Sequence, residues 1–280
     1  MTIKIGVILP TSTPDPALEI MGDVRASARL AEEYGLESVW STDHLVASAP
    51  MLDSTVVLAT AAAVTDRITI GFGVMLLALR PAAWAAKQVS SLQRVSGNRI
   101  ALGVGTGNPA HGDIGWRAAG VPFRDRGRRT DEALRVLPAL VTGQPAVLGD
   151  GLEVTLAPGS PMPPVIVAGN GDRALRRAAA YGDGWMCVGL PPEGVTAGLE
   201  TLGRSRRRAG PASPARDRRR PGARPRPGHG RRAPRGLRRG RRGASDHRSV
   251  RGRLGARLRV RRGAAGRALS RGQLRSGSTA

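Results

Sequence analysis

The pair Asp43-His44 is the first feature of this 280-residue sequence that could do chemistry. It comes directly after "ESVWS", a short segment with the alternation of a β-strand. An imidazole titrates near neutral pH, so His44 is a candidate to donate or accept a proton in catalysis. A histidine in a loop can also serve only as a cap or a structural hydrogen-bonding group, and the residue types leave both roles open.

Glycines gather where two further strand-like segments end. In "GFGVMLLALRP", Gly71 and Gly73 flank Phe72. Glycine inside a strand usually marks a bulge, or a place where a ligand or another backbone comes very close. The segment "GVGTGNP" contains Gly103, Gly105, Thr106, Gly107 and Asn108. It departs from the dinucleotide-binding fingerprint, because an asparagine stands where the third glycine should be.

The segment "AGNGDRAL" leads from a strand into a helix through the small residues Ala168, Gly169 and Gly171. The first N–H groups of a helix are unpaired, so this junction could cradle a phosphate. It could equally be an ordinary connection in which Asn170 or Asp172 caps the helix. His111 and Cys187 have no companion ligands at metal spacing, and we therefore predict no metal site.

Strand and helix patterns alternate along the chain, which is typical of a parallel sheet. We expect strands at 3–9, 37–41, 67–74, 99–105, 163–169 and 184–189. We expect helices at 16–34, 54–64, 81–96, about 122–141, 172–182 and 192–208, and a β-hairpin insertion at 146–156. A closed (β/α)₈ barrel needs eight such units. Six units therefore predict an α/β fold of the TIM (β/α)₈ type that is incomplete.

Charge divides the chain into two parts. The segment from Arg204 to Ala280 has 27 arginines against Asp217 and Asp246, a net of +25, whereas the whole chain carries +23 and residues 1–203 therefore carry −2. All eight Trp, Tyr and Phe residues precede this segment. We expect a barrel domain at 1–208 and a disordered, basic, low-complexity tail rich in Arg, Gly, Pro and Ala at 209–280. Within the barrel, Asp131 and Glu132 lie at pairing distance from arginines of their own helix, as on a solvated helix face.

The remaining composition predicts a cytoplasmic protein. The single cysteine, Cys187, excludes an internal disulfide and fits a reducing compartment. The longest apolar stretch, 56–64, is too short to span a bilayer, and the first ten residues do not form a signal peptide. We therefore expect no membrane partner.

Four spaced segments carry a resemblance to a known family: "GLESVWSTDHL", "RITIGFGVMLLALRPAAWAAKQVSSLQRVSGNRIALGVGTG", "GVPFRDRGRRTDEALRVL" and "PPVIVAGNGDRALRRAAAYGDGWM". In this order they resemble the luciferase-like monooxygenase superfamily, especially its branch dependent on the deazaflavin coenzyme F420. The resemblance covers about residues 1–208. It implies a (β/α)₈ barrel that binds F420 or FMN at the C-terminal mouth.

The resemblance also implies roles for particular residues. His44 would lie near the reactive ring as a catalytic proton donor or acceptor. The step from Gly73 to Val74 would form a bulge, often with a cis peptide in relatives, that supports the ring from behind. Cofactor contacts would come from Gly105, Thr106, Gly107 and Asn108, with phosphate-side contacts from Ala168, Gly169 and Asn170.

The expected activity is hydride transfer between F420 and a small organic substrate, and the alternative is an FMN-dependent monooxygenase. Several F420-dependent relatives have a catalytic glutamate where this chain has Asn108. An amide cannot exchange a proton as a carboxylate does, so the sugar-phosphate dehydrogenase reaction of those relatives is not expected. The expected partners are a small-molecule substrate and a second copy in a homodimer.

The tail has three interpretations. Its arginine-rich composition fits a frameshift near residues 209–215 in GC-rich coding DNA, which would make the chain an inactive product. It also fits an arginine-rich nucleic-acid arm, or a disordered segment without a role. Nothing in residues 1–208 points to a nucleic-acid ligand, so we expect no specific nucleic-acid partner.

Overall fold

The computed structural model describes residues 3–13 and 22–208. These residues belong to one compact unit of the chain, Met1–Ala223. The second unit, Arg224–Ala280, and the whole of the expected tail at 209–280 lie outside the described residues.

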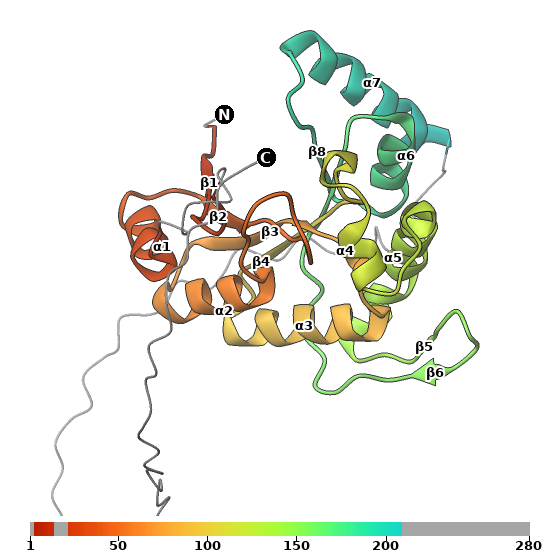
Figure 1. Cartoon of the computed structure of the whole chain (residues 1–280), viewed down its shortest axis with the longest axis horizontal. Coiled ribbons are helices and arrows are strands. Elements are labelled where there is room, and N and C mark those ends of the chain that lie inside the picture. The colour runs from red at the N-terminus through yellow and green to blue at the C-terminus, as the bar shows by residue number, and fades with distance from the viewer. Residues whose placement is uncertain (1–2, 14–21, 209–280) are drawn as a thin grey trace, which may run out of the picture. The chain divides into compact units, whose positions relative to one another are not determined.

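Six parallel strands form a single curled sheet in the order β1-β2-β3-β4-β7-β8 (Figure 1). The strands are β1 (Gly6–Ile8), β2 (Ser38–Ser41), β3 (Thr69–Met75), β4 (Ile100–Val104), β7 (Val165–Ala168) and β8 (Gly184–Met186). Each strand pairs with the next sheet strand along the chain, as in a barrel. The described strands therefore supply six of the eight that a closed barrel needs.

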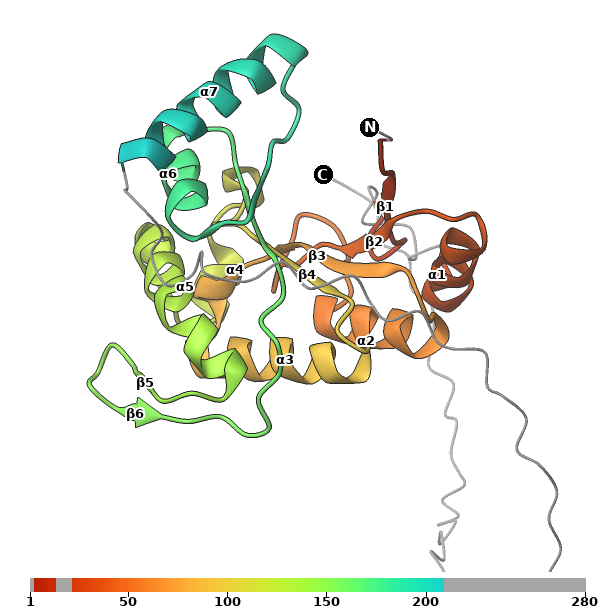
Figure 2. The same cartoon turned by 180° about the vertical axis from the view of Figure 1, so that it is seen from behind.

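Helices follow one another around the outside of the sheet, and the view from behind shows the same order (Figure 2). The helices are α1 (Val24–Glu33), α2 (Ser54–Val64), α3 (Ala82–Val95), α4 (Ile114–Ala118), α5 (Arg126–Thr142), α6 (Asp172–Tyr181) and α7 (Pro192–Arg208). The short α4 is the exception to this arrangement, because it lies in the connection after β4 and its Gly115 packs against Val46 of the loop after β2. Three short 3₁₀-helices lie at Leu77–Leu79, Pro109–His111 and Phe123–Asp125. None of the described helices is long and apolar enough to cross a membrane.

The expected insertion after α5 is a two-stranded antiparallel hairpin, β5 (Ala146–Val147) and β6 (Glu153–Val154). Glycines at its tip and Asp150, which accepts a hydrogen bond from the Leu152 N–H at 3.1 Å, form the turn. The hairpin prediction is confirmed.

Two helix starts were predicted wrongly. Helix α1 begins at Val24 and not at residue 16, because the Asp23 side chain caps it by accepting from the N–H groups of Arg25 and Ala26; residues 14–21 lie outside the described part. Helix α5 begins at Arg126, because the segment after Pro122 first forms a 3₁₀ turn. The α5 end at Gly143, with φ of 76°, agrees with the sequence to within a few residues.

The core lies between the sheet and the outer helices. Val39, Ile70, Leu102 and Val167 from four neighbouring strands are fully buried, as are many alanines, valines and leucines of α2, α3 and α5. Strand β1 is the exception, because the apolar run at 3–9 is typical of a buried strand. Its apolar side chains are exposed, with Ile8 65% accessible, because β1 is at the edge of the described sheet and has β2 as its one strand neighbour there.

Candidate functional site

A cavity of about 520 Å³ lies at the carboxyl ends of β2, β3, β4 and β7. It is lined by all ten residues predicted for the site: His44, Gly73, Val74, Gly105, Thr106, Gly107, Asn108, Ala168, Gly169 and Asn170. These residues come from four loops that are far apart in the sequence. The parallel sheet brings them together, since all its strands end at the same edge.

The backbone of β3 bends at the cavity. The register between β3 and β4 shifts between Phe72 and Met75, and the peptide bond between Gly73 and Val74 is cis. The Trp40 side chain of β2 packs against Gly73, where an added Cβ would lie 3.3 Å from the Trp40 Cβ. This bulge turns the Gly73-Val74 segment toward the cavity.

The other strand glycines serve the packing of the sheet itself. A Cβ at Gly71 would collide with the indole ring of Trp40, and one at Gly103 would collide with the carbonyl oxygen of Phe72. Of the two glycines that flank Phe72, therefore, Gly73 lines the cavity and Gly71 makes room for a tryptophan.

Asp43 anchors the loop that carries His44. Its buried carboxylate accepts hydrogen bonds from Ser54 Oγ at 3.0 Å, from the Leu76 N–H at 2.9 Å and from Arg80 Nη2 at 2.9 and 3.0 Å. The loop after β2 is thereby joined to the start of α2 and to the segment after β3. Asp43 acts as a structural anchor that fixes the backbone next to His44.

The His44 ring is half-buried at the cavity wall. Burial lowers the pKa of His44 below the ordinary histidine value, the neighbouring His111 lowers this pKa further, and the Asp43 carboxylate opposes both effects. The ring centroids of His44 and His111 are 4.4 Å apart at 64°, an edge-to-face contact. A neutral His44 imidazole at neutral pH can accept a proton at one nitrogen.

The loop after β4 curves around the cavity through Gly105, Thr106 and Gly107. Gly107 has φ of 85°, which a residue with a side chain rarely adopts, and its Cα faces the Trp116 ring. Asn108 caps the next 3₁₀-helix, because its Oδ1 accepts from the Ala110 N–H at 3.1 Å. The Asn108 amide oxygen is thus used within its own loop.

Helix α6 points its N-terminus at the junction after β7. Its N-cap is Gly171, without a side-chain cap, and this corrects the expectation that Asn170 or Asp172 would cap it. The Asn170 amide instead exchanges two hydrogen bonds with the backbone of Val188, at 2.7 and 3.0 Å. Asn170 therefore connects the loops after β7 and β8 beside the cavity.

Several cavity residues were not predicted from the sequence: Thr42, Met51, Leu76, Pro109, His111 and Val188. His111 is the chemically important one. The sequence drew attention to it only as a histidine without metal-site companions, although its place three residues after Asn108 was a signal. In the described residues no group of three or more His, Cys, Asp or Glu could hold a metal ion.

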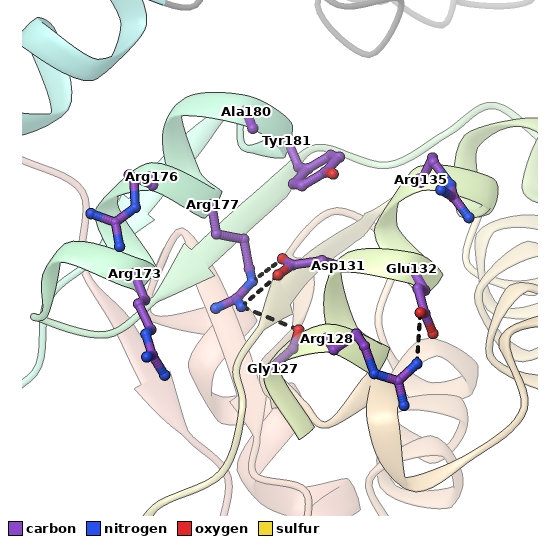
Figure 3. Close-up of a pocket in the computed structure, with 10 residues that line it drawn as sticks. All are labelled: Gly127, Arg128, Asp131, Glu132, Arg135, Arg173, Arg176, Arg177, Ala180 and Tyr181. Atoms are coloured by element: carbon purple, nitrogen blue, oxygen red, sulfur yellow. Dashed lines mark hydrogen bonds and ion pairs between the residues drawn. The ribbon is translucent and has the colours of Figure 1, made fainter. Parts of the chain in front are cut away.

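A second cavity, of about 600 Å³, lies away from these strand ends, between α5 and α6 (Figure 3). Arg177 of α6 reaches Asp131 of α5 at 2.5 and 3.1 Å, and Arg128 pairs with Glu132 at 2.7 Å. The cross-helix pair corrects the expectation that Asp131 would pair within its own helix. None of the predicted site residues lines this cavity, and the Arg177–Asp131 ion pair joins the two helices.

Comparisons with known proteins place the chain in a family. The sequence model of the luciferase-like monooxygenases matches residues 3–222, so the chain belongs to the luciferase-like monooxygenase family. An uncharacterized protein of Mycobacterium tuberculosis is 39% identical over 171 residues, which cover 59% of this chain and 58% of that protein. An F420-dependent hydroxymycolic acid dehydrogenase of the same organism is 30% identical over 202 residues, covering 63% of this chain and 55% of that enzyme.

The chain thus spans less than three fifths of the length of these two curated relatives. Among solved structures, the oxygenating constituent of 3,6-diketocamphane monooxygenase from Pseudomonas putida, in complex with FMN, is similar with a TM-score of 0.63 and 20% identity. The match covers 75% of this chain and 64% of that one. This likeness in fold supports the assignment of the curled sheet as an incomplete TIM-type barrel.

Proposed function

We propose that this chain is an F420-dependent oxidoreductase that transfers a hydride between the deazaflavin and a small organic substrate. The observation that carries the proposal is that His44 and the backbone of three glycine-containing strand ends line one cavity. The name of the M. tuberculosis dehydrogenase supports F420 as the cofactor.

Three features of the cavity support a flat redox ring as its ligand. Its volume of about 520 Å³ is within the range of roughly 300–1,000 Å³ that holds cofactor-sized ligands. Gly73, Gly105 and Gly169 present backbone to it, and a Cβ at Gly105 would lie 2.5 Å from Val74 Cγ2. The N-terminus of α6, which has no side-chain cap, offers N–H groups to a phosphate.

When bound, F420 supplies a ring carbon that accepts or donates a hydride. The protein's part is to hold the ring and to manage one proton. The Gly73-Val74 segment would support the ring from one face, and the loop 105–108 with residues 168–170 would hold its edge and phosphate. His44, uncharged at neutral pH because burial lowers its pKa, would take the proton from a substrate hydroxyl or return it.

An FMN-dependent monooxygenase is the second candidate. The similar barrel of the 3,6-diketocamphane enzyme contains FMN. In this chain Asn108 stands where several F420-dependent relatives have a catalytic glutamate, and its amide oxygen is used to cap the following helix. The FMN-containing barrel supports this candidate, and Asn108 argues only against the glutamate-dependent reaction of those relatives.

The first prediction concerns cofactor choice. The full chain is dialysed against F420 and, separately, against FMN, and the retained cofactor is measured by absorbance. We expect F420 to be retained and FMN to be lost. Gly105→Ala should weaken retention about tenfold, or by about 1.4 kcal/mol, because the methyl group would displace Val74 into the cavity.

Gly149→Ala is the matched control, because a Cβ at this hairpin glycine would meet nothing within 4 Å. Its cofactor retention should equal that of the unmodified chain. Retention of FMN in preference to F420 would replace the proposal by the monooxygenase. Retention of neither cofactor would remove both functions for this chain.

A further inference from the structure

His111 lies opposite His44 at the same cavity. It is the last residue of the 3₁₀-helix Pro109–His111, and residues three apart in such a helix lie above one another. His111 therefore lies on the same side of this 3₁₀-helix as its N-cap, Asn108. In this way the loop after β4 brings a titratable side chain to the cavity although Asn108 itself cannot titrate.

Ser48 orients the His111 ring. The Oγ of Ser48, from the loop after β2, is 2.9 Å from His111 Nδ1. Whichever atom donates in this hydrogen bond, the Nδ1 atom is occupied and the Nε2 atom remains available. On its other side the His111 ring makes the edge-to-face contact with His44, with 4.4 Å between the ring centroids.

We propose that His111 is a second proton-carrying residue of this site, which shares a single proton with His44 and so sets the pH at which His44 can accept one. The contact distance, the Ser48 hydrogen bond and the common cavity carry this assignment. Its role in turnover rests on the proposed hydride-transfer function, whereas the sharing of the proton is a property of the protein alone.

The physical basis is repulsion between like charges. Two imidazolium rings in edge contact in a half-buried place cannot both be charged at neutral pH without a large cost. A proton on one ring therefore opposes protonation of the other. The Asp43 carboxylate, which opposes the lowering of the His44 pKa, forms an ion pair with Arg80 at 2.9 Å. The lowered pKa of His44, with His111 among its causes, agrees with this arrangement.

In turnover, oxidation of an alcohol breaks the substrate O–H and C–H bonds and forms a C=O bond. The hydride would be taken up by the oxidised cofactor, and the hydroxyl proton would go to a ring nitrogen of the neutral His44–His111 pair. Because the second ring would repel another proton, the pair would hold only this one proton until it is released to water. In the reverse direction the same proton returns to the carbonyl oxygen.

The test is a histidine titration of the full chain by nuclear magnetic resonance, without cofactor. The His44 and His111 signals are assigned with single His44→Gln and His111→Gln variants. In the unmodified chain we expect both rings to titrate in two steps. In His111→Phe the aromatic ring and its cover over His44 remain while the charge is lost, so the titration midpoint of His44 should move upward and its curve should become a single step.

Ser48→Ala provides a second variant in which both histidines remain. Loss of the orienting hydrogen bond should reduce the separation between the two steps. An unchanged His44 midpoint in a folded His111→Phe chain would overturn the proposal, even if F420 binds and turns over. Conversely, a shifted midpoint in a chain that binds no F420 would leave the proton-sharing pair standing and overturn only the proposed function.

Discussion

The carboxylate of Asp43 shows how one side chain can position a reactive neighbour. Four donated hydrogen bonds reach it from Ser54, Leu76 and Arg80, and its side chain is only 4% exposed. Because these donors belong to different parts of the chain, the backbone at residue 43 has little freedom. The side chain of the next residue, His44, is therefore held at the cavity wall.

Asp43→Asn should destabilise the protein by about 3 kcal/mol, since it leaves the Arg80 guanidinium, 18% exposed, without its counter-charge. The measurement is the midpoint of urea unfolding, with the free energy taken from the fitted slope. Asp53→Asn is the control, because Asp53 is an exposed N-cap of α2 and asparagine caps a helix equally well. The control should change the free energy of unfolding by less than about 0.5 kcal/mol, and an equal loss in both variants would contradict the anchoring role.

At the residue scale, the sequence predicted a part of the site for clear reasons. Glycines and a histidine just past strand patterns must lie at one edge of a parallel sheet. The family resemblance adds the remaining contacts, and the ten residues share a cavity. The pairing of His111 with His44 could not be predicted, because it depends on how two loops, 63 residues apart at the Ser48–His111 contact, fold over each other. The role of Gly71 was also hidden, since it depends on the tilt of the Trp40 ring.

At the scale of elements, Glu32 joins the end of α1 to the start of β3. Its carboxylate accepts hydrogen bonds from the N–H groups of Asp66 and Arg67, at 2.9 to 3.2 Å. Partial burial would raise the pKa of Glu32, but these two backbone hydrogen bonds and the nearby arginines outweigh burial and lower the pKa. The carboxylate therefore closes the connection between α2 and β3.

Glu32→Gln should reduce the free energy of unfolding by about 1 kcal/mol at neutral pH, because an amide accepts these bonds more weakly and the group is largely solvated. A carboxylate whose folded pKa is lowered stabilises the protein above its unfolded pKa, near 4.5, and loses this contribution as pH falls below that value. The difference between the unmodified chain and Glu32→Gln should accordingly shrink when urea unfolding is repeated at about pH 3.5.

Glu33→Gln is the neighbouring control, since the exposed Glu33 side chain has no hydrogen bond or ion pair within the described part of the chain. Its unfolding free energy should not differ from that of the unmodified chain at either pH. A loss at Glu33 as large as that at Glu32 would show a general charge effect in place of a specific one.

Element boundaries were predictable where side-chain pattern and capping agree. Helix α2 runs from Ser54 to Val64, as the sequence predicts, with Asp53 as its cap. Helix α1 was predicted too long, because the apolar spacing continues upstream whereas the Asp23 side chain caps the start of the helix. Capping depends on local side-chain hydrogen bonds, which the spacing of apolar residues does not reveal.

At the scale of the whole molecule, the chain's charge is concentrated beyond the described residues. Residues 209–280 contain no Trp, Tyr or Phe and very little of the apolar material from which a core is made. A chain that ends at Arg208 should therefore retain the full helical circular dichroism signal per molecule and the same unfolding midpoint. A clear loss of signal on truncation would show that residues 209–280 are part of the folded barrel.

Strand β1 has the composition of an interior strand but an exposed position. Ile3, Ile5 and Ile8 are all more than 60% accessible, and the outer backbone edge of β1 has no strand partner among the described residues. An open edge of this kind is a template on which another chain can add its own strand. Self-association through this edge would then increase as protein concentration rises.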